Sequence, residues 1–159
     1  MQNLAEFNKP YKAGDDVRLN TQCLGDESPA AGEVDDRWRV VEVREYRSGN
    51  YYIVRDMTRS APDAEVMDID VMPYHLDPKE NRYTLYAWPH DEHGYIYRDD
   101  DPRDRQMLLG RFRTLREALD ARKTYAAGLL RAVDKVFANI GMIELFVVDF
   151  LAPRGGQMN

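Results

Sequence analysis

The histidines and carboxylates that lie close together in the sequence are the first candidates for chemistry. Residues 90–93 read His-Asp-Glu-His, and two imidazoles with one carboxylate are a donor set that binds zinc. These histidines lie three residues apart in a predicted turn, whereas the HExxH enzymes place them four apart on a helix. The favoured interpretation is a solvated turn, so we expect neither a metal nor another cofactor.

Paired carboxylates elsewhere are candidates for binding Mg²⁺ or Mn²⁺, which prefer several oxygen ligands. Asp68 and Asp70 alternate with apolar residues and are predicted on one face of a strand. The Pro62-Asp63 pair lacks the acidic-x-Lys sequence that a PD-(D/E)xK nuclease needs. Cys23 has no histidine near it, and the chain contains no G-x-S-x-G or phosphate-binding glycine motif. We therefore expect a protein without enzymatic activity, with a metal-dependent hydrolase as the weakest alternative.

Net charge differs between the two halves of the chain. The 159 residues carry a formal charge of −6, and residues 1–80 hold 10 Lys and Arg against 17 Asp and Glu, a charge of −7. Residues 81–159 hold 12 against 11, a charge of +1. This balance disfavours a simple DNA-coating protein, because proteins that bind phosphates over their whole surface carry a basic surplus.

The acidic half predicts a surface that docks onto a basic partner. Carboxylates spaced along strands can imitate the phosphates of a nucleic acid, and complementary charge steers association. The primary hypothesis is a binding protein for a macromolecular partner, and its most specific form is a phage- or plasmid-type inhibitor that acts by nucleic-acid mimicry. The candidate acidic contacts are Asp26, Glu27, Glu33, Asp35, Asp36, Asp68, Asp70, Asp99, Asp100 and Asp101.

Tyrosine and tryptophan crowd the predicted strands, and strand alternation cannot turn all of them inward. Tyr51 and Tyr52 are adjacent, so their rings must point to opposite faces of a strand. Exposed Tyr and Trp side chains favour protein interfaces or base stacking. The candidate aromatic contacts are Trp38, Tyr51, Tyr52, Trp88, Tyr95 and Tyr97.

An arginine-rich segment in the second half supports the runner-up hypothesis, a nucleic-acid-binding accessory protein. Residues 103–123 contain 7 basic and 3 acidic residues. Cationic side chains on a nucleic acid release counterions, so binding of this kind weakens steeply with salt. The candidate phosphate contacts are Arg103, Arg105, Arg111, Arg113 and Arg116.

The elements that position these residues begin with short strands. Strands are predicted around residue 17, over residues 37–46 and over residues 51–56, where Arg-Ser-Gly-Asn supplies a hairpin turn. A further strand is predicted over residues 65–74, whose apolar residues alternate with aspartates. We expect its apolar face in the core and its acidic face exposed.

The strands of the first half follow a definite order. A Gly-Asp-x-Val segment is followed by a long loop, a tryptophan-containing strand, a tight hairpin and a strand that ends at Tyr74-His75-Leu76. This order resembles the SH3-like or KOW-like small β-barrels over residues 13–77. The resemblance implies a module that binds peptides, RNA or another protein surface, although fold does not determine function.

The second half is predicted as a ββ(β)αβ unit. Its strands are expected over residues 82–88 and 94–98, with residues 106–113 as a third. The last strand, residues 143–151, is apolar at nearly every position. A strand of this composition is typical of burial on both faces.

A long helix is predicted over residues 114–140. Thr114 with Glu117 three residues later forms a capping box, and apolar residues then recur at three- and four-residue steps. The helix is continuous unless Gly128 breaks it. At roughly 39 Å it is longer than a small sheet can cover, so its distal half is predicted to pack against the first domain or against a second copy of the chain. Homodimerisation through this helix or the last strand is a side prediction.

The predicted fold class is α+β, with a small antiparallel β-barrel or meander in residues 1–78 and the ββ(β)αβ domain in residues 79–159. The single Cys23 excludes an intramolecular disulfide. The beginning of the sequence lacks a basic segment followed by an apolar one, and no window of ~18 residues is continuously apolar. We therefore expect a soluble cytoplasmic protein with no membrane partner.

Overall fold

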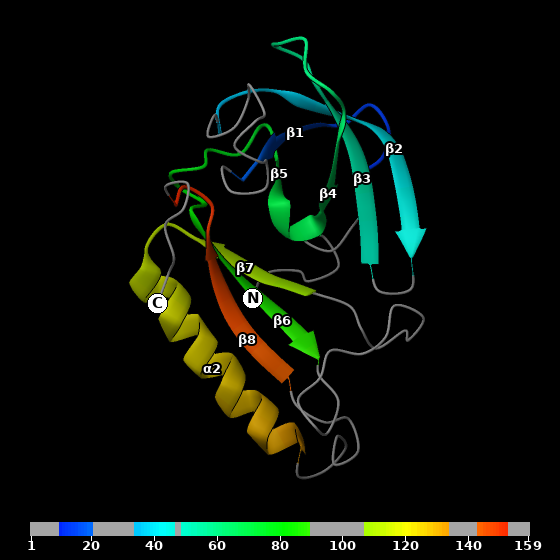
Figure 1. Ribbon diagram of the computed structural model, residues 1–159. Helices are drawn as coiled ribbons and strands as arrows, with labels where there is room; N and C mark the ends of the chain where they lie inside the picture. The colour runs from blue at the N-terminus through cyan, green and yellow to red at the C-terminus, as the bar shows by residue number, and fades with distance from the viewer. Residues whose placement is uncertain (1–9, 21–33, 47–48, 90–106, 134–142, 153–159) are drawn as a thin grey trace. The chain divides into compact units, whose positions relative to one another are not determined.

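The computed structural model of the chain describes residues 10–20, 34–46, 49–89, 107–133 and 143–152. These residues form two antiparallel sheets and one α-helix (Figure 1), which confirms the expected α+β class. The chain divides into two compact units. Unit 1 comprises residues 1–9, 46–49 and 83–148, and unit 2 comprises residues 10–45, 50–82 and 149–159. Residues 149–152 thus share a unit with the first strands, and the domain boundary predicted after residue 78 stays a prediction.

Unit 2 is built on a five-stranded sheet. Its strands cross the sheet in the order β4-β3-β2-β1-β5, so that β2, β3 and β4 form a meander and β5 lies on the other side of β1. The strands predicted around residue 17 and over residues 37–46 and 51–56 are confirmed. The five strands are β1 (Asp16–Leu19), β2 (Trp38–Tyr46), β3 (Gly49–Asp56), β4 (Ala64–Met67) and β5 (Val71–Pro73).

The apolar core of unit 2 forms where buried side chains meet across neighbouring strands. The register pairs Tyr52 with Val66 and Leu19 with Val71. Burying a side chain of this size stabilises the folded state by about 1.5–3 kcal/mol. The largest fully buried side chain is that of Trp38 on β2. The cluster consists of Val17, Leu19, Trp38, Val40, Tyr52, Val54, Val66 and Val71.

The single strand predicted over residues 65–74 is wrong, because a 3₁₀ turn divides it. β4 ends at Met67, and the turn η1 (Asp68–Asp70) separates it from β5. The Asp70 carboxylate accepts a hydrogen bond from the Met67 amide at 2.9 Å, and aspartates that bond to nearby backbone in this way compete with extended structure. Asp68 and Asp70 therefore do not line the acidic face of a strand.

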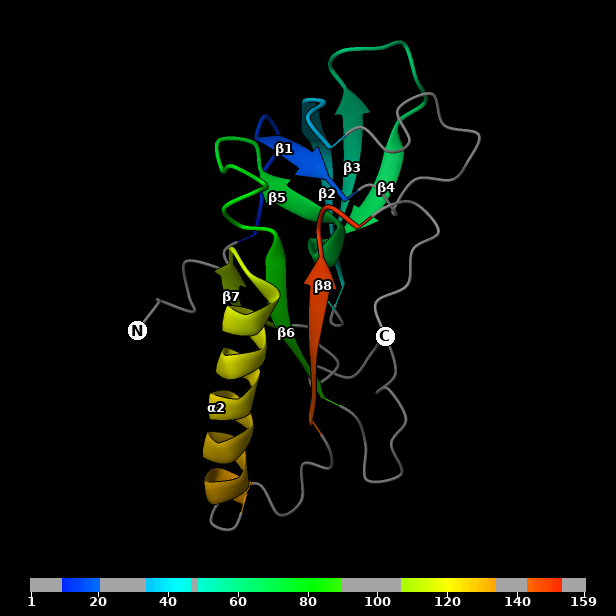
Figure 2. The ribbon, with the colours of Figure 1, turned by 90° about the vertical axis from the view of Figure 1, so that its left-hand side faces the viewer.

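Unit 1 combines a three-stranded sheet with a helix. Its elements are β6 (Tyr83–Pro89), β7 (Met107–Phe112), α2 (Leu115–Val133) and β8 (Ile143–Asp149). The strand order β7-β6-β8 places β6 in the centre, and Figure 2 shows α2 running along β7 and β6, which it contacts. The strands predicted over 82–88 and 106–113 are confirmed, whereas the one over 94–98 lies outside the described residues.

The central strand β6 is well buried. Leu85 is fully buried, and its neighbours Thr84 and Tyr86 are 3% exposed. Tyr86 lies opposite Leu108 of β7, after a bulge that shifts the register between Leu85 and Tyr86. The Tyr86 ring also stacks on Phe146 of β8, with 5.6 Å between the ring centroids. Tyr86 of β6 therefore contacts both outer strands of the sheet.

The helix α2 begins at the predicted capping residue. Thr114 Oγ1 accepts a hydrogen bond from the Glu117 amide at 3.2 Å, which satisfies one of the free N–H groups of the first turn. The helix continues through Gly128 and is described as far as Val133, while residues 134–140 of the predicted range lie outside the described residues. Ala118 is completely buried, and a side chain this small lets the helix approach the sheet closely.

The strand β8 occupies its predicted position, but its predicted burial is wrong. It lies at the edge of the sheet, and the described side chains from Leu145 to Val148 are only partly buried. An apolar sequence indicates that a strand is shielded from water. It does not indicate whether the strand has a neighbour on one side or on both. Dimerisation through β8 or α2 stays a prediction.

An ion pair joins the two points at which the chain leaves and re-enters unit 2. The Arg82 guanidinium donates from Nε and Nη2 to the two Asp149 carboxylate oxygens, at 2.8 and 2.9 Å. The Asp149 side chain is 8% exposed. The Phe150 amide donates to the Arg82 carbonyl oxygen at 2.8 Å. Residues 82 and 150 are therefore held side by side although they lie far apart in the sequence.

Candidate functional site

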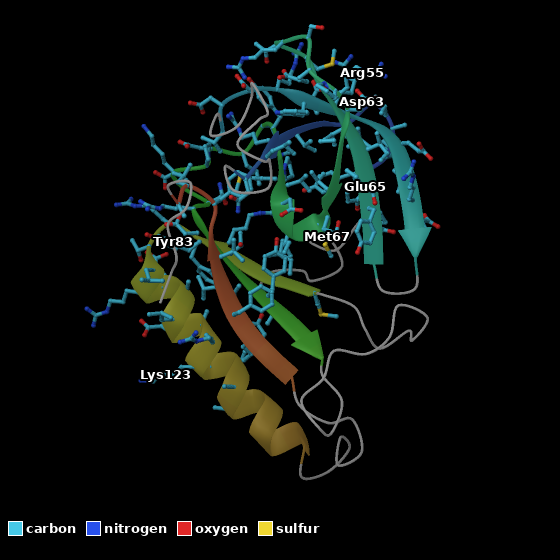
Figure 3. The ribbon with its side chains drawn as sticks, viewed as in Figure 1. Arg55, Asp63, Glu65, Met67, Tyr83 and Lys123 are labelled. Carbon is cyan, nitrogen blue, oxygen red and sulfur yellow. The ribbon has the colours of Figure 1, made fainter. Side chains whose placement is uncertain are left out.

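Basic side chains gather at the end of β7 and on the first half of α2. Arg113, Arg116, Arg122 and Lys123 are exposed there, and we call these four residues the basic surface. Arg116 and Lys123 lie seven positions apart, so they share one side of the helix; Lys123 is labelled on α2 in Figure 3.

The basic surface has no carboxylate partners within the described ranges. None of the ion pairs formed there involves its three arginines or Lys123. The exposed carboxylates of Glu117 and Asp120 lie on the same helix, but they form no ion pair with it. The positive charge of this surface is therefore not neutralised by direct contact.

The remaining arginines predicted as phosphate contacts are placed differently. Arg111 lies on β7 and is partly buried, so its guanidinium is less accessible to a partner than those of the basic surface. Arg103 and Arg105 lie outside the described residues. The additional members of the site are Arg122 and Lys123. They lie in the basic segment 103–123 but are not among the predicted phosphate contacts.

The arginines of unit 2 contrast with this surface. Every arginine that the structure describes in unit 2 lies within 4.0 Å of a carboxylate, so part of the acidity of the first half is neutralised inside the unit. Figure 3 labels one such pair, Arg55 and Asp63. The pairs are Arg18–Asp35, Arg37–Asp16, Arg39–Asp16, Arg44–Glu65, Arg55–Asp63, Arg59–Asp36 and Arg82–Asp149.

The predicted acidic contacts are only partly gathered into one surface. Asp35 is 86% exposed and pairs with Arg18 at 3.2 Å, whereas Asp36 is 12% exposed and pairs with Arg59. Asp68 and Asp70 occupy the turn η1 and are partly buried. The other predicted carboxylates lie outside the described residues: Asp26, Glu27, Glu33, Asp99, Asp100 and Asp101.

The turn η1 borders a hydrogen-bond network centred on Tyr52. The Tyr52 hydroxyl donates to Asp68 at 2.7 Å and accepts from the Tyr11 amide at 3.3 Å. Burial raises the pKa of Tyr52 above its usual range, and the charge of Asp68 and its hydrogen bond to Tyr52 raise it further. The hydroxyl therefore stays protonated and acts as a structural donor in this network.

Substitution of Asp70 with asparagine is expected to raise the free energy of unfolding at pH 7. Burial raises the pKa of Asp70 and the nearby charge of Asp68 adds to this, although the Met67 amide opposes it. The native state therefore loses stability as pH rises from about 3.9, the ordinary pKa of aspartate, through the raised pKa. An asparagine oxygen can still accept the Met67 hydrogen bond but carries no charge.

Urea denaturation at several pH values measures this effect. The variant and the wild type should have similar stability below about pH 3.9, where both side chains are neutral, and the variant should gain as pH rises. Asp35→Asn is the control, because it removes a carboxylate that is 86% exposed. A variant at position 70 that is less stable than the wild type at pH 7 would contradict the expectation.

Two of the predicted aromatic contacts are core residues. Trp38 is 1% exposed and Tyr52 is fully buried, so neither can contact a partner from the folded surface, and their prediction as contacts is wrong. Tyr51 is partly exposed, which agrees with the expectation that adjacent tyrosines face opposite sides. The side chain of Trp88, together with Tyr95 and Tyr97, lies outside the described part of the chain.

The predicted metal ligands give no described site. Within the described ranges, no group of three or more His, Cys, Asp and Glu side chains could hold a metal ion. The His-Asp-Glu-His sequence at 90–93 falls outside those ranges. Among the described residues, no helix has the length and apolar character needed to span a membrane.

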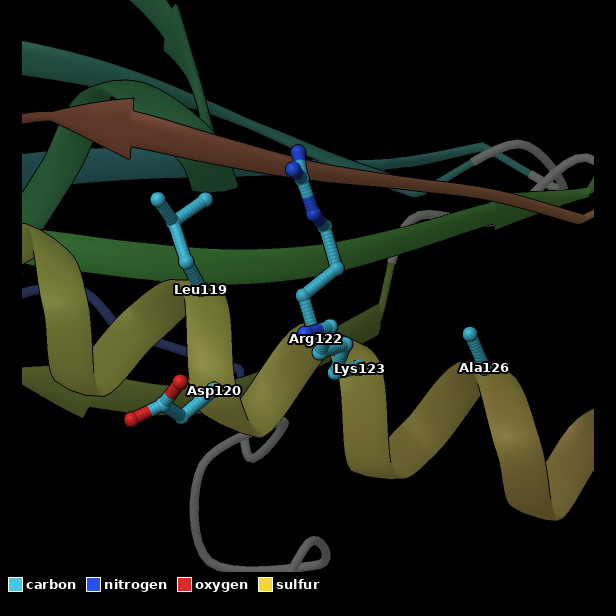
Figure 4. A pocket seen from close by; sticks show the side chains of 5 residues that line it. All are labelled: Leu119, Asp120, Arg122, Lys123 and Ala126. Carbon is cyan, nitrogen blue, oxygen red and sulfur yellow. The ribbon is translucent and has the colours of Figure 1, made fainter.

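A hollow on α2 adds an apolar component to the basic surface. It has a volume of about 380 Å³ and is lined by Leu119, Asp120, Arg122, Lys123 and Ala126 (Figure 4). Leu119 and Ala126 are not among the site residues predicted from the sequence. Their spacing of three and four residues from the two cations is the signal that could have found them.

The chemistry that this arrangement offers is binding. Guanidinium and ammonium groups donate hydrogen bonds to an anion, and the hollow provides carbon surface beside them. Arginine matches a phosphate or carboxylate through two parallel hydrogen bonds. Comparison with known proteins found no match to this chain among protein-family models, curated proteins or solved structures.

Proposed function

We propose that the protein is a non-enzymatic binding protein that uses the basic surface of β7 and α2 to hold the sugar-phosphate backbone of a nucleic acid. The observation that carries this proposal is the contrast in charge pairing between the units. Unit 2 pairs each of its described arginines with a carboxylate, whereas Arg113, Arg116, Arg122 and Lys123 have no carboxylate partner within the described ranges.

Unpaired exposed cations favour a polyanionic partner for a physical reason. An arginine already bound to a carboxylate must give up that partner before it can bind a phosphate, and a free one need not. Phosphate contacts release condensed counterions, which supplies most of the affinity of sequence-independent binding. The acidic balance of the whole chain lowers this affinity, so the proposal predicts weak binding that is visible mainly at low salt.

The acidic-surface hypothesis stays a prediction. Its described members Asp35 and Asp36 are already paired with arginines, which gives the geometry less support for it than for the basic surface. The two hypotheses predict opposite partners. A nucleic acid should bind the basic surface, whereas a basic protein should bind the acidic surface.

Neutralising two cations of the basic surface should weaken nucleic-acid binding. The variant Arg116→Gln/Lys123→Gln should lose about tenfold or more in affinity, an effect of at least ~1.4 kcal/mol. The slope of log affinity against log salt should become shallower by ~0.7–0.9 for each phosphate contact removed. Fluorescence anisotropy with a labelled oligonucleotide, between about 50 and 200 mM salt, measures both quantities.

The matched control is Arg44→Gln/Arg55→Gln. It removes the same formal charge from exposed arginines of unit 2 that are paired with Glu65 and Asp63. This control should keep the affinity and the salt slope of the wild type. The proposal fails if no nucleic acid binds at low salt, or if the two double variants lose affinity equally.

A further inference from the structure

We infer that the hollow on α2 holds one phosphate group and the adjoining sugar of a single-stranded nucleic acid. The inference rests on the proposed function and specifies the form of nucleic acid that the basic surface prefers. The volume of the hollow, about 380 Å³, lies near the small end of ordinary ligand pockets, which begin at roughly 300 Å³. The hollow is therefore of a size for one phosphate and its adjoining sugar rather than for several nucleotides.

The lining combines positive charge with carbon surface. Figure 4 shows that the side chains of Leu119, Arg122 and Ala126 rise from one side of the helix, while the Asp120 carboxylate points to the other side. An anion that approaches this side of the helix therefore contacts Arg122 and Lys123 before it comes near the Asp120 carboxylate. Carbon atoms attached to that anion then lie against Leu119 and Ala126.

A sugar phosphate fits this combination better than a bare anion. Its phosphate oxygens accept hydrogen bonds from the Arg122 guanidinium and the Lys123 ammonium group. Its sugar carbons cover the apolar side chains of Leu119 and Ala126. Inorganic phosphate would satisfy the cations and leave those two side chains in water.

The outward face of α2 favours a single strand over a duplex. Glu117, Asp120 and Thr124 are exposed and recur at the three- and four-residue steps that place them on one face. A helix inserted into the major groove, which is about 12 Å wide, lies between two rows of phosphates. The two carboxylates would then face phosphates, whereas a single strand can lie along the side of the helix that carries Leu119, Arg122 and Ala126, away from the Asp120 carboxylate.

The test compares a labelled single strand of thymidines with a duplex of the same length, by fluorescence anisotropy on the full chain. The single strand should bind about tenfold more tightly than the duplex or better. Arg122→Gln should weaken single-strand binding by about tenfold, because it removes one charged contact. Leu119→Gln should also weaken it, although it changes no charge.

The matched control is Ala127→Gln, because Ala127 is exposed on the same helix and does not line the hollow. It should bind as the wild type does, and circular dichroism checks that each variant keeps its helix. Inorganic phosphate should displace the single strand only at far higher concentration than a short thymidine oligonucleotide.

Three outcomes would overturn the inference while leaving the proposed function standing. They are equal affinity for the two forms of DNA, effects at Arg122 and Leu119 no larger than the effect at Ala127, and equal competition by inorganic phosphate. Failure of the proposed function looks different. In that case neither form of DNA binds, or neutralising Arg116 and Lys123 changes nothing.

Discussion

Replacing Trp38 with alanine is expected to lower the free energy of unfolding by about 3–5 kcal/mol. Trp38 is 1% exposed and is the largest fully buried side chain among the described residues. The substitution removes its apolar surface from the core of unit 2 and leaves a cavity. Neighbouring Val17 and Val40 are short β-branched residues with stiff side chains, so they cannot collapse into the space. Urea denaturation followed by circular dichroism measures the loss.

Trp38→Phe is the informative control for this prediction. It keeps an aromatic ring in the core and removes the indole N–H, which is buried without a hydrogen-bond partner among the described residues. An unsatisfied buried donor costs about 1–3 kcal/mol, so its removal offsets part of the lost packing. The phenylalanine variant should therefore be clearly more stable than the alanine variant. Equal losses in the two variants would contradict the role of Trp38 as a core residue.

Replacing Asp149 with alanine is expected to lower the free energy of unfolding by about 2–4 kcal/mol. Its carboxylate is 8% exposed and accepts two hydrogen bonds from Arg82 and one from the Leu151 amide at 3.0 Å. Breaking a buried pair typically costs about 3–5 kcal/mol, because the remaining charge loses its partner. The Arg82 side chain is 38% exposed, so water compensates part of that loss.

Asp63→Ala is a control with nearly the same geometry and different burial. Asp63 also accepts two hydrogen bonds from one guanidinium, that of Arg55, each at 3.1 Å. That pair lies at the surface, with side chains 58% and 35% exposed, and exposed pairs contribute little to stability. Thermal or urea denaturation should show a clearly larger loss of stability for Asp149→Ala than for Asp63→Ala. Similar losses at positions 63 and 149 would show that burial does not set the strength of these pairs.

Local sequence patterns predicted the elements whose causes are local. The capping box at Thr114, the run of strand-forming residues over 37–46 and the apolar run that starts at Ile143 each correspond to an observed element. Hydrogen-bond capping and side-chain periodicity act over a few residues, so they are visible in one sequence. The turn η1 escaped prediction because Met67, Ile69 and Val71 also have the spacing of a strand.

Contacts between distant residues could not be predicted in the same way. Arg18 and Arg59 pair with carboxylates that are set by strand order and register. A run of aspartates in the sequence looks identical whether or not each aspartate has an arginine partner in the fold. The sequence therefore does not show which of these carboxylates are available to a partner. The burial of Trp38 was equally hidden, because composition does not say which face of a strand becomes the interior.

The ion pair of Arg82 and Asp149 joins residues that leave the ribosome at very different times, which has a consequence for folding during synthesis. A ribosome completes β1 to β5 long before it reaches Phe150 and Ala152, two buried residues of unit 2. The whole of residues 83–148 is synthesised in between. Domains generally fold as units during synthesis, with the N-terminal one first. Here unit 2, whose five strands are all made before residue 83, acquires the buried residues Phe150 and Ala152 only afterwards. The nascent chain must therefore carry an incomplete unit 2 throughout the translation of residues 83–148.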